Sequence, residues 1–249
     1  KTIDDVWNDA TSREKLLEDT RKRNRGGTTP ANNIYECFRI NSGSVVMFKA
    51  ITAKYIYQKY GASMVLDPTA GWGGRMMGAW AMNIDYTGID TNINMKPAYD
   101  SMISFLDQHS TKDLFGNKSL INMIWKDFLE VDISNIPFDF VLTSPPYVNM
   151  EVYEHMRMWS SDKGFYKDFL IPLWEKCNDN IMSGGTICLN ISPKMYEDGV
   201  RYGLPTCNHE EDLLQQLGQQ MTKKKQDKIY IWKNTNINYG VGIYHLIEN

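Results

Sequence analysis

The stretch that decides the fold reads Val65-Leu66-Asp67-Pro68-Thr69-Ala70-Gly71-Trp72-Gly73-Gly74-Arg75. Its apolar start predicts a short strand over residues 63–67, and a helical pattern over 75–81 follows directly. The turn between them would lie at the carboxyl end of a strand, where ligands bind in open α/β sheets. Gly71 and Gly73 allow positive φ and a close approach of the backbone to a ligand. The alternative for this stretch alone is an ordinary strand–helix turn.

The spacing of this turn disfavours two common phosphate sites. It does not follow the pattern G-x-G-x-x-G, and no Lys-Ser or Lys-Thr pair comes after it. A dinucleotide site and a P-loop are therefore not expected. The carboxylate of Asp67, at the predicted strand tip, would repel phosphate and suits a cationic ligand.

Strand-like and helix-like segments alternate along the chain outward from this turn. Further strands are predicted over 85–90, 120–125, 138–143, 185–191, 228–232 and 241–247, and helices over about 44–60, 95–109, 166–182 and 209–221. The alternation predicts a doubly wound, mostly parallel α/β sheet of seven strands. The last two strands are too close in the chain for a parallel crossover, so an antiparallel C-terminal hairpin is expected.

Length and composition fit one large α/β domain. The chain has 249 residues, of which 42% are hydrophobic and 23% charged, so a disordered, collagen-like or coiled-coil chain is not expected. Residues 1–33 are polar and charged and are interpreted as an N-terminal extension, with the α/β domain over 34–249. The net charge of −3 excludes a bulk polycation, so any contact with nucleic acid has to be local.

The cysteines indicate neither a metal site nor a disulfide framework. Cys37, Cys177, Cys188 and Cys207 form no C-x-x-C pair, which favours a reducing, cytoplasmic compartment and no bound metal. No apolar run approaches the roughly 20 residues that span a bilayer, and the charged start does not resemble a signal peptide. No membrane association is therefore expected.

Two further predicted strands end in acidic residues. Asp90 ends the strand at 85–90, next to the tip that carries Asp67, and suits a carboxylate that accepts both hydroxyls of a ribose. Lys126-Asp127-Phe128 follows the strand at 120–125. Asp127 and Phe128 suit an adenine, held by a hydrogen bond to its amino group and by a ring contact. A solvated loop acid beside a core phenylalanine fits this second pair equally well.

The fourth predicted strand runs into Thr143-Ser144-Pro145-Pro146-Tyr147. Two prolines give a stiff turn without backbone donors. Carbonyl and hydroxyl acceptors then face one place, with an aromatic ring beside them. This arrangement suits a planar amine held against a stacking surface, and a purely structural turn is the alternative.

Together these segments resemble motifs I, II, III and IV of the S-adenosyl-L-methionine-dependent DNA amino-methyltransferases, which methylate N4 of cytosine or N6 of adenine. The motifs are Asp67–Gly73, Asp90, Asp127–Phe128 and Ser144–Tyr147, and 38–44 resembles motif X. The resemblance spans roughly 38–249 with the motif order X, I, IV. It implies a Rossmann-like class I methyltransferase fold, S-adenosyl-L-methionine as cofactor and DNA, in preference to RNA, as substrate.

The resemblance also implies roles for individual residues. The expected cofactor contacts are Ser42, Asp67, Pro68, Ala70, Gly71, Gly73, Asp90, Asp127 and Phe128. The expected catalytic residues are Ser144, Pro145, Pro146 and Tyr147. The Ser144 hydroxyl and the Pro145 carbonyl would accept hydrogen bonds from the target amine, and Tyr147 would stack on the target base.

The residue before Pro-Pro bears on the target. Serine is more typical of the cytosine N4 members of the family, whereas asparagine or aspartate is typical of the adenine N6 members. Ser144 therefore favours cytosine, with adenine as the alternative. Methylation of an RNA base or of a protein glutamine is a further alternative, although those families carry Asn-Pro-Pro-Tyr. A catalytically silent nucleic-acid-binding subunit is a non-enzyme alternative, which intact motifs I and IV oppose.

Little of the chain is left for reading a DNA sequence. The two free segments between late elements, 148–165 and 192–208, are short. They imply a small recognition surface, a short target, or help from a second copy of the chain or a partner subunit. The candidate DNA-backbone contacts are Arg21, Arg23, Arg25, Lys223 and Lys224. Such basic clusters are more often solvated faces than binding sites.

Overall fold

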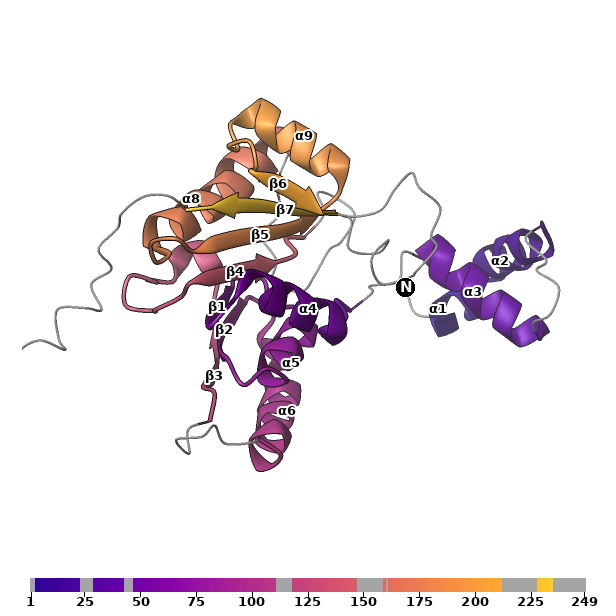
Figure 1. Cartoon of the computed structure of the whole chain (residues 1–249). Helices are drawn as coiled ribbons and strands as arrows, with labels where there is room; N and C mark the ends of the chain where they lie inside the picture. Colours follow the sequence, from indigo (N-terminus) through magenta and orange to yellow (C-terminus); the bar gives the residue numbers. More distant parts are fainter. Residues whose placement is uncertain are drawn as a thin grey trace, which may run out of the picture. The chain divides into compact units, whose positions relative to one another are not determined.

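The computed structural model of the chain describes residues 3–22, 29–42, 47–110, 118–146, 159, 161–211 and 228–234. The chain divides into two compact units, Lys1–Val46 and Met47–Asn249 (Figure 1). Residue 33, where the sequence analysis ended the N-terminal extension, lies within a helix of the first unit. The two units are therefore described separately.

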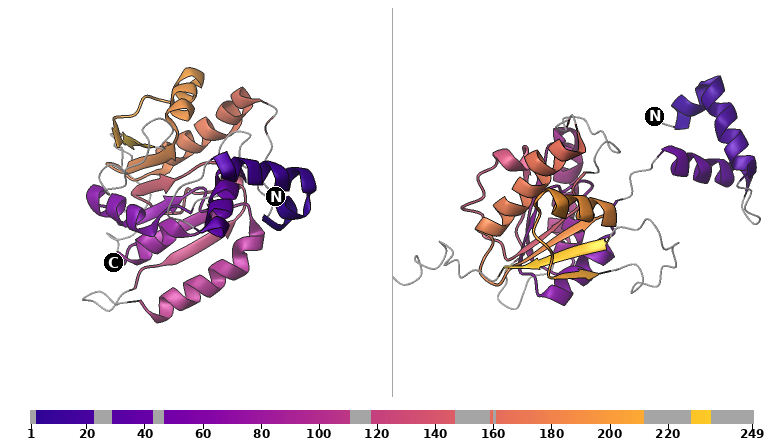
Figure 2. Two further views of the ribbon diagram at one scale, coloured as in Figure 1. Left: turned by 90° about the vertical axis from the view of Figure 1, so that its right-hand side faces the viewer. Right: turned by 90° about the horizontal axis from the view of Figure 1, so that it is seen from above.

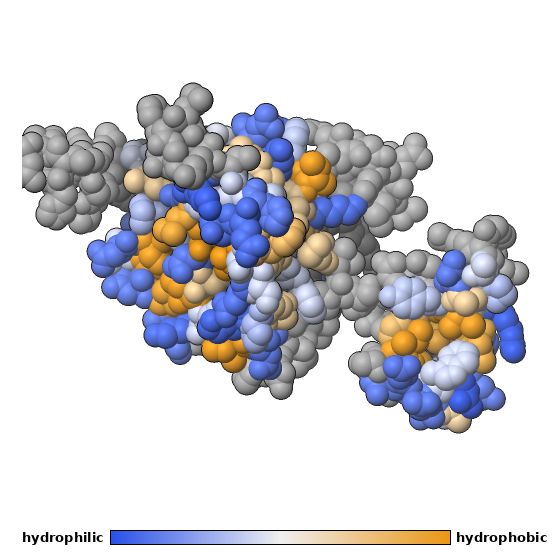
Figure 3. Space-filling model, turned by 90° about the horizontal axis from the view of Figure 1, so that it is seen from below, coloured by the Kyte–Doolittle hydropathy of each residue, from blue (hydrophilic) through white to orange (hydrophobic). Residues whose placement is uncertain are grey.

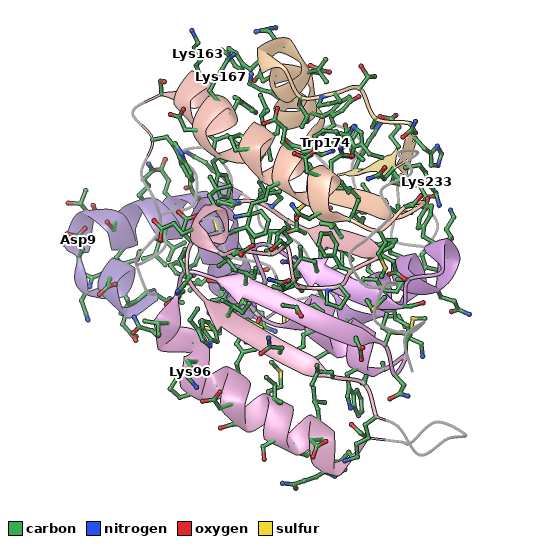
Figure 4. The ribbon with its side chains drawn as sticks, turned by 90° about the vertical axis from the view of Figure 1, so that its left-hand side faces the viewer. Asp9, Lys96, Lys163, Lys167, Trp174 and Lys233 are labelled. Atoms are coloured by element: carbon green, nitrogen blue, oxygen red, sulfur yellow. The ribbon has the colours of Figure 1, made fainter. Side chains whose placement is uncertain are left out.

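The first unit contains three helices, α1 (Ile3–Asn8), α2 (Ala10–Lys22) and α3 (Pro30–Ser42). Asp9, labelled in Figure 4, accepts a hydrogen bond from the Ser12 N–H at 2.7 Å and so caps the start of α2. Leu16 and Cys37 are buried. Apolar residues of this unit gather in the middle of the face drawn in Figure 3. This segment, interpreted from its charge as an extension, is thus helical with buried apolar side chains.

The second unit is built on a seven-stranded sheet of order β3-β2-β1-β4-β5-β7-β6. The strands are β1 (Met64–Asp67), β2 (Asp85–Asp90), β3 (Ile121–Trp125), β4 (Phe140–Thr143), β5 (Thr186–Ile191), β6 (His209–Glu211) and β7 (Lys228–Lys233). β1 to β5 are parallel, whereas β7 is antiparallel to both β5 and β6. The predicted fold class, a mostly parallel seven-stranded sheet with an antiparallel C-terminal pair, is confirmed.

The identity of the sixth strand corrects one prediction. Residues 209–211, assigned from the sequence to the start of a helix, form β6 and pair with β7. Glutamates favour helices, but here Glu211 is buried and its carboxylate accepts hydrogen bonds from Lys59 and Tyr60 of α4 (Ala50–Tyr60). Tertiary contacts override local propensity in such a short edge strand. The strand predicted over 241–247 lies outside the described residues.

Helices cover both faces of the sheet (Figures 1 and 2). One face carries α4, α5 (Gly74–Trp80) and α6 (Lys96–Gln108), and the other carries α7 (Asp162–Phe165), α8 (Ile171–Asn180) and α9 (Pro193–Tyr202). Val65 packs among the first group and Leu66 among the second, as the alternation of side chains along a strand requires. No helix in the described part of the chain is long and apolar enough to cross a membrane.

Helices α4 and α5 approach each other closely because glycines line their contact. A Cβ atom on Gly78 would lie 2.6 Å from the Ala53 Cβ of α4, and one on Gly74 would lie 1.8 Å from the carbonyl oxygen of Phe48, two residues before α4 begins. These two glycines are four residues apart and therefore share one face of α5. The close approach fixes the helix that begins directly after the glycine-rich turn.

Gly74→Ala should destabilise the second unit by about 1–3 kcal/mol, because the new methyl group meets backbone that cannot move aside as a flexible side chain would. Thermal unfolding followed by circular dichroism measures the loss. Gly164→Ala is the matched control, since the nearest atom to a Cβ there is the Ser161 Oγ at 3.4 Å. Equal melting temperatures for the two variants would contradict the close approach of α5 to the segment that leads into α4.

Candidate functional site

A pocket opens at the carboxyl ends of the parallel strands. It encloses about 870 Å³, including space open to solvent, and is lined by Pro68, Thr69, Gly71, Trp72, Asp90, Thr91, Asn92, Met95, Lys126, Asp127, Phe128, Ser144, Pro146, Trp159 and Phe169. The strand order reverses between β1 and β4, and ligands of open α/β sheets bind at such a switch point.

The glycine-rich turn forms one wall of the pocket. Gly71 and Gly73 both adopt left-handed backbone conformations, with φ of 59° and 81°. Gly71 lines the pocket, whereas a Cβ on Gly73 would lie 2.6 Å from the Met102 Cε of α6. Tyr99, also on α6, donates a hydrogen bond to the Gly71 carbonyl at 2.9 Å. The turn is therefore held from behind by α6, and only part of it faces the pocket.

Asp67 lies beneath the pocket rather than in its wall. Its carboxylate is fully buried and accepts hydrogen bonds from the Arg75 Nε and the Tyr86 hydroxyl, each at 2.7 Å. Arg75 also donates to the Thr69 carbonyl. The cation that the sequence analysis expected beside Asp67 is thus the chain's own guanidinium group.

The charges of this buried pair stabilise each other. Burial alone would lower the pKa of Arg75, but the charge and hydrogen bond of Asp67 outweigh it and raise that pKa. Burial and then the charge of Asp67 raise the pKa of the Tyr86 phenol well above its ordinary value, so this hydroxyl stays a donor. The network fixes the turn between β1 and α5 from within the core.

Asp90, at the end of β2, faces the pocket. Its Oδ2 accepts a hydrogen bond from the Gly71 N–H at 2.8 Å, and its Oδ1 accepts one from the Asn92 N–H at 2.9 Å. Burial raises the pKa of this carboxyl group, although both backbone hydrogen bonds act against the rise. Each oxygen keeps a further lone pair that a ligand hydroxyl group can use. Asp90 therefore ties the glycine-rich turn to the tip of β2.

Asp127 and Phe128 stand at the start of η2 (Phe128–Glu130), directly beyond β3. The Asp127 side chain accepts a hydrogen bond from the Leu129 N–H at 2.9 Å and so caps this short helix. The Phe128 ring is buried, and the Lys176 Nζ of α8 lies 5.1 Å from its centroid. Both predicted adenine contacts thus line the pocket and are positioned by local structure.

Ser144 directly follows β4 and makes hydrogen bonds with the loop after β1 and with β5. The Thr69 hydroxyl donates to the Ser144 carbonyl at 3.1 Å and lies 2.6 Å from the Thr143 hydroxyl. The Ser144 hydroxyl accepts a hydrogen bond from the Asn190 Nδ2 at 3.2 Å and donates a long one to the Asn190 carbonyl at 3.4 Å. The loop after β1 and the loop after β4 therefore meet at this residue.

An aromatic cluster forms the opposite wall. The Trp159 ring lies 4.9 Å from Phe165 and 5.2 Å from Phe169, measured between centroids. Phe169 belongs to a π-helical segment, η3 (Tyr166–Leu170), between α7 and α8. Single π-helical turns of this kind occur frequently at functional sites. Figure 4 shows Lys163 and Lys167 extending outward from the same stretch.

Two polar atoms on pocket-lining residues lack a partner. The Asn92 Oδ1 and the Trp159 Nε1 are both buried, and neither makes a hydrogen bond with the described residues. An unsatisfied buried acceptor or donor costs about 1–3 kcal/mol, so a ligand that supplied the missing partners would bind the more strongly. Asn92 was not identified from the sequence. Trp159 ends an aromatic, methionine-rich run over 148–159, which the sequence suggested either as a loop enclosing the target base or as the start of an amphipathic helix.

The pocket brings together many of the predicted site residues. Those that line it are Pro68, Gly71, Asp90, Asp127, Phe128, Ser144 and Pro146. Those outside its lining are Asp67, Ala70, Gly73 and Pro145, all of which are buried. Those outside the described residues are Arg23, Arg25, Tyr147, Lys223 and Lys224, and the side chain of Ser42 is likewise not described.

The remaining predictions concern nucleic acid and metal. Arg21 is exposed in the last turn of α2, in the first unit. Within the described ranges, no group of three or more His, Cys, Asp or Glu side chains is placed to hold a metal ion. The structure describes too little of the basic clusters to group them into one surface, so their contact with DNA stays a prediction.

No protein-family model matches the chain, and no curated protein matches it. Among solved structures, an RNA methyltransferase from Salinibacter ruber in complex with S-adenosyl-L-homocysteine is 13% identical, with a TM-score of 0.45, and the match covers 76% of this chain and 94% of that one. An rRNA methylase from Streptococcus thermophilus is 10% identical, with a TM-score of 0.49 and coverage of 78% and 100%. NSun6 from Pyrococcus horikoshii is 11% identical, with a TM-score of 0.49 and coverage of 76% and 52%. Similarities at this level do not assign a substrate, so the pocket itself has to carry the functional proposal.

Proposed function

We propose that the chain is an S-adenosyl-L-methionine-dependent methyltransferase that acts on an exocyclic amine of a DNA base, with N4 of cytosine as the target. One observation carries the proposal: Asp90, Asp127 and Ser144, which stand at three different strand ends, line a single pocket. The sequence resemblance implies cofactor or amine contacts for these same residues. Parallel strands bring their carboxyl ends to one edge in any such sheet, so the argument rests on which side chains stand there: two carboxylates and a hydroxyl group, which suit this cofactor and an amine.

The walls of the pocket suit the adenosine part of the cofactor. Phe128, Trp159 and Phe169 provide flat apolar surface for a purine ring. The unsatisfied Asn92 Oδ1 needs a donor and the unsatisfied Trp159 Nε1 needs an acceptor, and an adenine edge offers both. The spare lone pairs of Asp90 suit the two hydroxyl groups of the ribose.

The overall charge of the pocket suits a positively charged cofactor. Its ionisable lining residues are Asp90, Asp127 and Lys126, so carboxylates outnumber ammonium groups. A cofactor that carries a sulfonium and an ammonium group is attracted to such a site, whereas a phosphate-bearing dinucleotide is repelled. S-adenosyl-L-methionine supplies the activated methyl group, and the protein supplies binding and orientation.

Ser144 is placed to hold the target amine. The lone pair of an exocyclic base amine is delocalised into the ring, which makes the nitrogen a poor nucleophile. An acceptor that draws one amine hydrogen out of the ring plane favours sp³ geometry and frees the lone pair. The amine loses a proton only after it has reacted, so no strong general base is required. Positioning and preorganised dipoles then supply most of the catalysis.

The shape of the site requires an accessible base. Ser144 lies in a pocket, and a base stacked in a duplex cannot reach it without being flipped out. The serine before Pro-Pro supports cytosine over adenine on the sequence resemblance. Single-stranded DNA should therefore be methylated at least as fast as duplex DNA, because it avoids the unpairing cost of a few kcal/mol.

The deciding experiment is transfer of a tritiated methyl group to DNA and RNA, single- and double-stranded, followed by mass spectrometry of the nucleosides. N4-methylcytosine in DNA is the expected product. If the product is N6-methyladenine, adenine is the target base in place of cytosine. If the product is a methylated ribonucleoside, RNA is the substrate in place of DNA. Absence of transfer to every nucleic acid, with enzyme that binds the cofactor, would overturn the proposed function.

Tyr147→Ala should lower methyl transfer by about ten- to a hundredfold while leaving cofactor affinity within about twofold of wild type. Stacking of an aromatic side chain on a base contributes about 1–3 kcal/mol, and the resemblance places Tyr147 against the target base. Transfer assays and calorimetric titration with S-adenosyl-L-methionine give the two quantities. Tyr35→Ala, at an exposed tyrosine of the first unit, is the control. Undiminished transfer by Tyr147→Ala would refute the stacking role.

A further inference from the structure

The Ser144 hydroxyl is held at two points by a single residue of β5. The side-chain amide of Asn190 donates to the Ser144 Oγ at 3.2 Å, and the backbone carbonyl of Asn190 accepts from the same Oγ at 3.4 Å. Both residues are half-buried, and Ser144 lines the pocket. Because β4 and β5 are neighbouring parallel strands, their carboxyl ends bring the two residues together.

The polarity of these contacts fixes where the hydroxyl hydrogen points. A serine hydroxyl has one hydrogen and two acceptor lone pairs. A backbone carbonyl can only accept, so the hydrogen is directed toward Asn190 and away from the pocket. The Asn190 amide occupies one lone pair. Among the described residues no other partner uses the Oγ, and its second lone pair remains for a group in the pocket.

We propose that Asn190 is a positioning residue that presents Ser144 to the pocket as a hydrogen-bond acceptor and thereby selects an amine over a carbonyl on the target base. The inference rests on the proposed methylation of a base amine. A carbonyl oxygen, as in thymine or uracil, would meet the Ser144 lone pair and be repelled. Cytosine, which carries an amine at the same ring position, would be accepted.

The selectivity can be measured by binding alone. The probes are single-stranded oligothymidines with one central cytosine or one central 2-pyrimidinone, which lacks the amine, and fluorescence anisotropy is read with S-adenosyl-L-homocysteine present. One hydrogen bond contributes about 0.5–1.5 kcal/mol, so wild type should bind the cytosine strand up to about tenfold more tightly. Equal affinity of wild type for the two strands would overturn the inference.

Two substitutions separate positioning from packing. Asn190→Leu keeps the size of the side chain but leaves the Ser144 hydroxyl with only the long bond to the backbone carbonyl at 3.4 Å, which is too weak to hold its hydrogen out of the pocket. The preference for cytosine should therefore fall to within about twofold. Asn190→Asp can still hold the Oγ, because the hydroxyl hydrogen then turns to the carboxylate, and should retain most of the preference. If Asn190 served only to pack the core, Asn190→Leu would retain more of the preference for cytosine than Asn190→Asp, since leucine would preserve the packing and a half-buried charge would not.

Kinetics supply the second readout. Asn190→Leu should lower kcat about tenfold with little change in cofactor affinity. It should add nothing to Ser144→Ala, because a residue that acts through Ser144 has no effect once that hydroxyl is gone. Additive losses, or a fully active Asn190→Leu, would overturn the inference while wild-type transfer leaves the proposed function standing. A wild type that transfers no methyl group would instead overturn the proposed function, and the inference with it.

Discussion

Arg75→Met should lower the free energy of unfolding by about 3–5 kcal/mol, because it leaves the Asp67 carboxylate buried without its counter-charge. Asp67 has no exposed surface and Arg75 is 4% exposed, and their atoms lie 2.7 Å apart. Whole proteins are stable by only about 5–15 kcal/mol, so the loss is a large share of the total. In a chain of this size it corresponds to a melting temperature lower by about 6–20 °C.

Two companion variants make this result specific. Lys96→Met breaks the exposed Lys96–Asp100 pair on α6, whose side chains are 48% and 58% exposed, and should change stability by less than about 1 kcal/mol. Asp67→Asn combined with Arg75→Met removes both charges and leaves an acceptor for Tyr86, so it should be more stable than Arg75→Met alone. Chemical unfolding followed by tryptophan fluorescence compares the three. An Arg75→Met variant as stable as Lys96→Met would contradict the buried network.

Asp90→Ala should weaken S-adenosyl-L-methionine binding by about a hundredfold or more. The substitution removes the acceptor for the ribose hydroxyls, and hydrogen bonds to a charged group contribute about 1.5–3 kcal/mol each. It also frees the Gly71 and Asn92 N–H groups that shape the pocket wall. Calorimetric titration with S-adenosyl-L-methionine and S-adenosyl-L-homocysteine measures both affinities. The absence of any heat of binding to wild type would contradict the cofactor assignment itself.

The control lies on the same strand. Asp85, at the opposite end of β2, accepts a hydrogen bond from the Leu120 N–H at 2.8 Å, and Asp85→Ala should leave cofactor affinity near wild type.

The pH dependence of cofactor binding gives an independent check on Asp90. Because burial raises the pKa of Asp90, this carboxylate takes up a proton at higher pH than an ordinary aspartate. Wild-type affinity should therefore fall as pH decreases, with the onset above the usual range for aspartate.

The architecture was predictable because its signals are strong and local. Apolar strands that alternate with amphipathic helices leave few topologies open, and parallel strands bring their carboxyl ends to one edge. That geometry alone explains why Asp90, Asp127 and Ser144, far apart in the sequence, line one pocket. The short strand β6 was missed for the opposite reason, because its pairing depends on distant partners rather than on its own residues.

The finer contacts of the site depend on distances that no local pattern encodes. Arg75 is the second residue of α5 and reaches back to Asp67 because the glycine-rich turn between them reverses the direction of the chain. Trp159 and Phe169 pack together in one wall of the pocket, and Phe169 is placed there by a π-helical segment, which has no reliable sequence signature. Nothing in the sequence distinguishes Asn190 from any other polar residue near the end of a strand, because its contact with Ser144 arises only from the pairing of β4 with β5.

The hydroxyl groups of Thr69 and Thr143 have a thermodynamic consequence. They join the loop after β1, which is proposed to contact the cofactor, to the loop after β4, which is proposed to contact the target base. Thr69 bonds to the Ser144 carbonyl, and its hydroxyl lies 2.6 Å from that of Thr143, so a shift of either loop is transmitted to the other. Linkage requires such an effect to be reciprocal: whatever factor the cofactor adds to the affinity for the base, the base adds to the affinity for the cofactor. Titration of either ligand in the presence of the other therefore measures the same coupling free energy.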